Sequence, residues 1–109
     1  MKKAKTEVRP SSGNVFADLG LKDPEEAMLK AQFASRIAQT IAARGFNQTE
    51  AARHLGIDQP KVSALLRGRL NGFSTDRLFK YVRMLGSDVE ITLRDAREGV
   101  GHFELHLAV

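Results

Sequence analysis

The sequence predicts a mainly α protein of four to five helices that ends in a short C-terminal β-hairpin. Three observations carry this prediction. Apolar residues recur at helical spacing in several segments of residues 23–85, and capping residues and glycines mark where these segments begin and end. After Gly86 the apolar residues alternate with polar ones, which is the period of a half-buried strand. A chain of 109 residues is long enough for one compact domain and a tail.

The first segment with helical period covers residues 23–44. Asp23 is a candidate N-cap, Pro24 suits the first helical position, and Glu26 stands three residues after the cap. Gly45 supplies a C-terminal stop. The apolar face consists of four side chains at helical spacing: Leu29, Phe33, Ile37 and Ile41. We therefore expect one long amphipathic helix.

Three shorter helices follow, each opened by a capping residue and closed by a glycine. The expected pairs of cap and stop are Asn47 and Gly56, Asp58 and Gly68, and Ser74 or Thr75 and Gly86. Asn47 and Glu50 have the spacing of a capping box, in which each side chain bonds the other residue's backbone N–H. The last helix has its own apolar stripe: Leu78, Phe79, Val82 and Leu85.

The alternating segments after Gly86 predict two strands joined by a loop at residues 95–101. The apolar positions are Val89, Ile91 and Leu93 in the first strand and Phe103, Leu105 and Leu107 in the second. An isolated two-stranded hairpin is marginally stable in water, so its apolar face needs a cover. Either the helical domain or a second copy of the chain can provide it, and residues 87–109 are therefore a candidate dimerisation element.

Residues 47–69 have the pattern of a helix-turn-helix, two short helices that pack against a longer one. Ala51, Ala52 and Leu55 share one face of the first helix, and the alanines let another helix approach closely. Gly56 tolerates the left-handed backbone of the turn, and Ile57 follows as an apolar plug for the corner. In the second helix, Val62, Leu65 and Leu66 form the apolar face.

The rest of the second helix carries side chains that suit a DNA major groove. Gln59 can pair with an adenine edge, Lys61 with guanine acceptors, and Ser63 with either base. The ring of Pro60 can touch a thymine methyl group. Arg67 can neutralise a phosphate, and Gln48 begins the first short helix, where helix N-termini attract anions.

The positive charge of the chain is concentrated around this motif. Residues 44–83 hold eight Lys or Arg and three acids, whereas the remaining residues hold nine Lys or Arg and ten acids. Such a distribution favours a polyanionic partner. A small helical bundle with a solvated basic face is the alternative interpretation.

The stretch QTEAARHLGIDQPKVSALLRG resembles the helix-turn-helix of lambda-type phage repressors and of the wider XRE family. The resemblance implies a lambda-repressor-like domain over residues 14–86. It also implies that Gln48 contacts the DNA backbone and supports Gln59. The base-facing residues would be Gln59, Pro60, Lys61 and Ser63, and the phosphate-facing ones Arg67 and Arg69.

Residues 14–94 more closely resemble a group of small XRE proteins that includes the HigA-type antitoxins. Members of this group repress their own operon, usually as homodimers. From the two-fold geometry of such a dimer we expect a pseudo-palindromic operator of double-stranded DNA. They are generally paired with a RelE-like ribonuclease toxin in a type II toxin–antitoxin system. The resemblance therefore implies an autorepressing antitoxin, with a stand-alone XRE-type repressor as the alternative. Residues 101–109 do not resemble the group, so the resemblance implies no role for them.

The N-terminal residues fall into two parts. Residues 1–13 are polar and basic and end in Pro, Ser and Gly, which predicts a flexible basic tail. Residues 14–21 are a short apolar patch, NVFADLGL. This patch suits a strap docked on the domain or a segment that binds a toxin, and the sequence leaves both open.

Composition excludes several classes of protein. No apolar run reaches the ~18 residues of a membrane span, and no apolar stretch of a signal peptide follows the basic N-terminus, so a cytoplasmic location is expected. The absence of cysteine excludes disulfides, cysteine nucleophiles and thiolate metal sites. His102 and His106 are ~13 Å apart on a straight strand, too far to share an ion. No nucleophile elbow, phosphate-binding loop or zinc pattern appears, so we expect no enzyme, cofactor or metal site.

Overall fold

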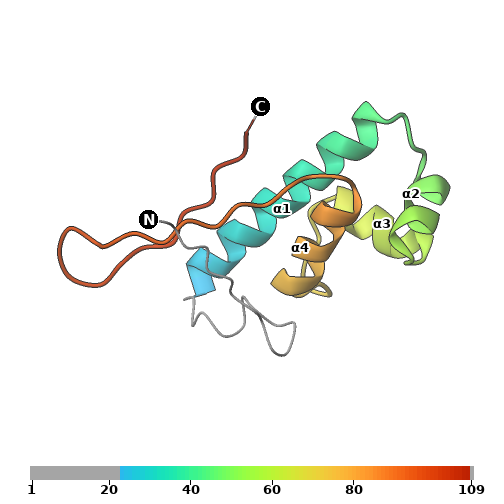
Figure 1. Cartoon of the computed structure of the whole chain (residues 1–109). Coiled ribbons are helices and arrows are strands. Elements are labelled where there is room, and N and C mark those ends of the chain that lie inside the picture. Colours follow the sequence, from blue (N-terminus) through green and yellow to red (C-terminus); the bar gives the residue numbers. More distant parts are fainter. Residues whose placement is uncertain (1–22, 109) are drawn as a thin grey trace.

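The computed structural model describes residues 23–108, so the predictions for residues 1–13 and 14–21 lie outside the described residues. Four α-helices make up its regular structure (Figure 1): α1, Asp23–Ala43; α2, Gln48–Leu55; α3, Gln59–Leu66; and α4, Thr75–Met84. These bounds confirm the four predicted helices to within about a residue. Within residues 23–108 there is no fifth helix.

The core lies where α1 packs along α4 and where α2 and α3 pack on each other and on this pair. All four residues of the predicted α1 face are buried, as are Leu78, Val82 and Leu85 at α4. Phe79 is half-buried, and its ring lies 5.9 Å from that of Phe33. A long helix thus supports three short ones, which could not be stable alone because helices of this length are marginal in water.

The helix starts use the predicted caps in three different ways. The capping box at α2 is confirmed: Asn47 Oδ1 accepts from Glu50 N, and Glu50 Oε1 accepts from Asn47 N, each at 2.8 Å. Asp58 occupies the N-cap of α3, but its side chain makes no capping hydrogen bond. At α4 the cap is Ser74, whose Oγ accepts from Arg77 N at 3.1 Å.

The C-terminus of α4 is held by one side chain from α2 and one from the residue that follows α1. Nη2 of Arg44 donates to the carbonyl oxygen of Leu85 at 2.7 Å, and Nε2 of His54 lies 3.2 Å from that of Met84. Carbonyl groups at a helix end lack intrahelical partners, so these contacts satisfy two of them. They also fix α2 and the end of α1 against α4.

The C-terminal region corrects the prediction of a β-hairpin. Residues 87–108 run out from α4, turn, and come back without forming a strand (Figure 1). Val89, Phe103 and Leu105 pack partly against the core, whereas Ile91 is 62% and Leu93 86% exposed. The helical domain therefore covers only some of the apolar positions, and a two-stranded hairpin without a full cover is marginal.

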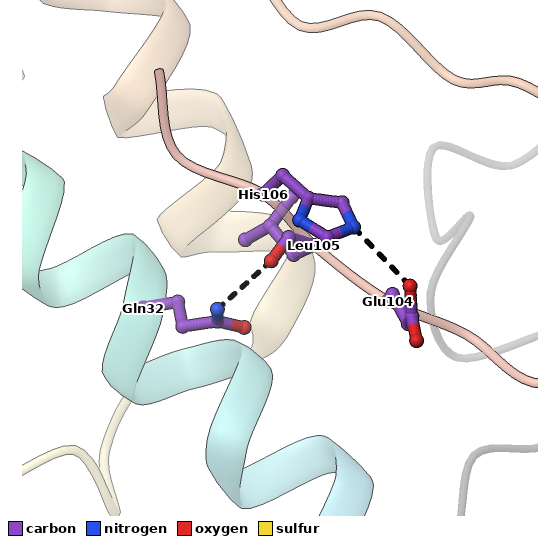
Figure 2. Close-up of polar contacts among 4 residues, drawn as sticks. All are labelled: Gln32, Glu104, Leu105 and His106. Carbon is purple, nitrogen blue, oxygen red and sulfur yellow. Dashed lines mark hydrogen bonds and ion pairs between the residues drawn. The ribbon is translucent and has the colours of Figure 1, made fainter. Parts of the chain in front are cut away.

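The second half of residues 87–108 is not paired as a strand. It is held by hydrogen bonds from side chains of α1. Nε2 of Gln32 donates to the carbonyl oxygen of Leu105 at 3.0 Å, as Figure 2 shows, and Nη2 of Arg36 donates to that of Ala108. His106 turns to Glu104, with 3.2 Å between Nε2 and Oε1. The C-terminal segment thus lies along α1 as extended chain.

Candidate nucleic-acid interface

The turn between α2 and α3 has the geometry of a helix-turn-helix. Ala51 and Val62 are fully buried, and Leu65 is nearly so, which fixes the inner faces of both helices. Gly56 adopts the left-handed conformation with φ of 72°, and its N–H donates to the carbonyl oxygen of Ala52. Ile57 is partly buried against the core, as predicted for the corner.

The first turn of α3 carries three of the four predicted base-facing residues on the surface. Gln59, Pro60 and Lys61 are exposed, whereas Ser63 is half-buried. Pro60 lies at the start of the helix, where the absence of its N–H leaves no hydrogen bond unmade. Because Val62 and Leu65 are buried, the inner face of α3 is fixed, and Gln59, Pro60 and Lys61 lie away from the core.

The predicted phosphate-facing residues flank this surface. Gln48 is the half-buried first residue of α2, and Arg67 and Arg69 are exposed just after α3. The backbone of Arg69 is tied to the last turn of α3 by a hydrogen bond of 2.9 Å from its N–H to the carbonyl oxygen of Ala64. Neither guanidinium pairs with another described side chain, so both are available to an anion.

One contact within this surface was not anticipated from the sequence. Oγ1 of Thr49 lies 3.5 Å from Oε1 of Gln59, a long hydrogen bond between the first turns of α2 and α3. The sequence had suggested that Gln48 supports Gln59, but no hydrogen bond joins these two among the described residues. Thr49 follows Gln48 in the first turn of α2, and this position was the one sequence feature that could have indicated its contact with Gln59.

The loop between α3 and α4 is anchored by aromatic residues that the sequence patterns also missed. Phe73 is 4% exposed, and its ring meets that of Tyr81 edge to face with centroids 6.3 Å apart. This buried anchor lies four residues beyond Arg69. Because Phe73 and Leu70 pack on the core, the loop that carries Arg67 and Arg69 is held against the domain.

Within residues 23–108, no three His, Asp or Glu side chains gather closely enough to hold a metal ion. Each helix of the described chain is too short or too polar to span a lipid bilayer.

Comparison with known proteins agrees with this geometry. A model of a family described as "Helix-turn-helix domain" matches residues 15–94. The chain is also similar to a solved structure named "Putative XRE Family Transcriptional Regulator", with 35% identity and a TM-score of 0.71. That similarity covers 81% of this chain and 99% of the other. No curated protein matches the sequence.

Proposed function

The chain belongs to the helix-turn-helix domain family and is an XRE-like helix-turn-helix regulator, and from this premise we propose that it is a sequence-specific DNA-binding repressor. The observation that carries the proposal is the first turn of α3. There, Gln59, Pro60 and Lys61 are exposed together, and the proposed phosphate-binding residues are Gln48 at the start of α2 and Arg67 and Arg69 just after α3. This surface has the residue types of a recognition helix in a major groove.

Each side chain has a role in the proposed complex. Gln59 pairs with an adenine edge, Lys61 with guanine acceptors, and Pro60 touches a thymine methyl group, while Ser63 contacts either base. The phosphate contacts come from Gln48, Arg67 and Arg69. These contacts position α3 and supply much of the affinity, but they do not distinguish one base sequence from another.

We propose further that the protein binds as a homodimer through residues 87–108. Four large apolar side chains of this segment are left exposed by the single chain: Ile91, Leu93, Val100 and Leu107. A second copy related by a two-fold axis would cover them. The two α3 helices would then enter successive major grooves about 34 Å apart on a pseudo-palindromic operator.

The antitoxin role is a narrower part of the proposal. It is supported by the resemblance of residues 14–94 to HigA-type antitoxins, and it makes a RelE-like ribonuclease toxin the protein partner. A stand-alone cytoplasmic repressor without a toxin is the alternative. The neighbouring reading frame discriminates them: a gene for a small basic RelE-like protein favours the antitoxin, and its absence favours the stand-alone regulator.

The decisive experiment for DNA binding is selection of duplexes from a random library with the purified protein at near-physiological salt. An inverted repeat with half-sites about one helical turn apart is expected. A single half-site would retain the DNA-binding proposal and overturn the dimer. If no sequence is enriched, the basic face of α3 is a solvated surface and the proposal fails.

Two variants then test the assignment of α3 on the selected duplex. Gln59→Ala should reduce discrimination at one base pair by about 1–3 kcal/mol, because one bidentate contact is lost. Lys61→Glu should weaken binding to every duplex, because it reverses a charge in the groove. An unchanged base preference in Gln59→Ala would show that a different face of α3 meets the DNA.

The dimer is tested by analytical ultracentrifugation of Ile91→Asp against Thr92→Asp. Both positions are exposed in the single chain, and both changes introduce the same charge. Ile91→Asp should weaken the dimer more than Thr92→Asp, because it also removes an apolar side chain that a second copy would cover. Equal dissociation constants for the two variants would place the interface elsewhere.

A further inference from the structure

Residues 102–108, the tail, bind to α1 through their backbone. Nε2 of Gln32 donates to the carbonyl oxygen of Leu105 (Figure 2), and Nη2 of Arg36 donates to that of Ala108. Gln32 and Arg36 are one turn apart, so they share one face of α1. This face, the tail site, holds an extended backbone, and it would hold the tail of another copy of the chain in the same way.

The tail is attached to its own domain by a small buried surface. Besides the two hydrogen bonds, it is anchored by Phe103 and Leu105, which pack against the core but are only partly buried. The other residues of the tail are exposed. A segment that buries so little surface can leave its site and bind again without unfolding the four helices.

The segment that joins α4 to the tail can open without loss of contacts. Every residue from 90 to 102 is exposed, and Figure 1 shows the turn of this segment standing away from the helices. Among the described residues, no backbone hydrogen bond joins residues 88–102 to one another or to the helices. Gly99 in the turn has a left-handed conformation with φ of 65°, and glycine adopts an extended conformation just as readily.

The same segment is long enough to reach a second copy. At ~3.3 Å per residue, residues 90–102 span roughly 40 Å when extended. The 21-residue helix α1 is about 32 Å long, so the opened segment can reach a tail site on a neighbouring domain. It also carries large apolar side chains that the single chain leaves uncovered: Ile91 is 62%, Leu93 86% and Val100 88% exposed.

We propose that two copies of the chain exchange their tails. The tail of each copy occupies the tail site of the other, and residues 88–101 of the two copies run antiparallel across the two-fold axis. The exchanged dimer keeps the docking contacts of the single chain, because each tail site receives the same residues. It also brings Ile91 and Leu93 of one copy against the other, which removes apolar surface from water. The exchange rests on the proposed homodimer and specifies how that dimer is built.

The test is an isotope-filtered NOE measurement on full-length protein. Labelled (¹³C) and unlabelled chains are mixed in urea and refolded together, so that the copies redistribute. Protons of Leu105 and of the Gln32 side-chain amide are close only where a tail occupies a tail site. An NOE from labelled Leu105 to unlabelled Gln32 is expected.

Two other outcomes are distinguishable. An NOE confined to one chain, in a protein that sediments as a dimer, would overturn the exchange and leave the homodimer standing. A protein that sediments as a monomer at every concentration would overturn both the exchange and the homodimer. Neither outcome bears on DNA recognition by α3, which the library selection measures separately.

Complementation between two defective variants is an independent test. Gln32→Ala combined with Arg36→Ala removes the polar contacts of the tail site, and Leu105→Asp removes an anchor of the tail. Each variant alone should dimerise about tenfold more weakly than wild type. In an equimolar mixture, the intact tail of the first variant can dock in the intact site of the second, so part of the dimer should return.

The control for the tail variant is His102→Asp, which introduces the same charge at an exposed position of the tail. It should dimerise nearly as well as wild type, and circular dichroism verifies that all variants keep their helices. A mixture that is no more dimeric than its two components would overturn the proposal. Without exchange, a tail can dock only in its own chain, and each chain of the mixture carries one defect.

Discussion

The hydroxyl of Thr49 lies 3.5 Å from Oε1 of Gln59, and this contact joins the first turns of α2 and α3. Both residues are exposed, so the contact contributes little to stability. Its consequence is orientation. When the hydroxyl donates to Oε1, the amide of Gln59 is turned so that its NH₂ group is free to donate to a base.

Thr49→Val, which replaces the hydroxyl by a methyl group of similar size, should therefore leave folding nearly unchanged and reduce base discrimination at the Gln59 position. We expect a loss of about 0.5 kcal/mol, at the low end for one hydrogen bond because the contact is long. Fluorescence anisotropy on the selected duplex and its single-base variants measures this. Thr49→Ser keeps the hydroxyl and is the control. Equal discrimination by the two variants would show that Thr49 does not orient Gln59.

The second prediction concerns the N-caps of α2 and α3. The side chain of Asn47 makes a capping hydrogen bond, whereas that of Asp58 makes none. Asn47→Ala should lower the free energy of unfolding by about 1 kcal/mol, since it removes the side chain of a complete capping box. Asp58→Ala should cost clearly less, because the Asp58 side chain makes no capping hydrogen bond. Urea unfolding monitored by circular dichroism compares them. A larger loss for Asp58→Ala would mean that its carboxylate caps α3 in solution.

Local signals were sufficient to predict the helices. Asn47 with Glu50, and Ser74 three residues before Arg77, mark helix starts because a side-chain oxygen reaches a backbone N–H only a turn away. Gly56 marks a stop because its left-handed conformation is set by the turn itself. The inner faces followed from helical spacing, since Leu29 and Ile37 share one side of α1 whatever packs on it.

Features that depend on tertiary contacts could not be predicted in this way. Period-two alternation at Ile91 and Leu93 indicates a strand only when something covers the apolar side, and in the single chain they stay exposed. Tyr81 was missed because its burial depends on Phe73, which reaches it from the loop before α4. Thr49 was missed for the same reason, since its partner lies ten residues away on another helix.

The phosphate role of Arg69 predicts a specific salt dependence. Arg69→Gln should weaken binding to all duplexes alike and reduce the slope of log affinity against log salt concentration by about 1, the contribution of one neutralised phosphate. Arg53→Gln removes another exposed arginine, one outside the proposed interface, and should leave the slope unchanged. Anisotropy titrations at several salt concentrations give both slopes. If they fall equally, the arginines act through net charge and not through a contact.

The close approach of Gly86 to Arg44 gives the last prediction. Gly86 has a φ of 98°, and a Cβ added there would lie 2.8 Å from Nη2 of Arg44. That nitrogen donates to the carbonyl oxygen of Leu85, so Gly86→Ala should both strain the backbone and displace the hydrogen bond that closes α4. The left-handed conformation alone costs an L-residue about 1–2 kcal/mol, and we expect a loss of at least that size in the free energy of unfolding.

Gly72→Ala is the matched control, because Gly72 lacks a positive φ and a Cβ there would meet no atom within 4 Å. Its effect on urea unfolding should stay within about 0.5 kcal/mol. Repeating Gly86→Ala in an Arg44→Ala background separates the two causes, since only the backbone strain then remains. A smaller cost in that background shows that the guanidinium is displaced. An equal cost in both backgrounds would mean that Arg44 accommodates the added methyl group and that the cost of Gly86→Ala is backbone strain alone.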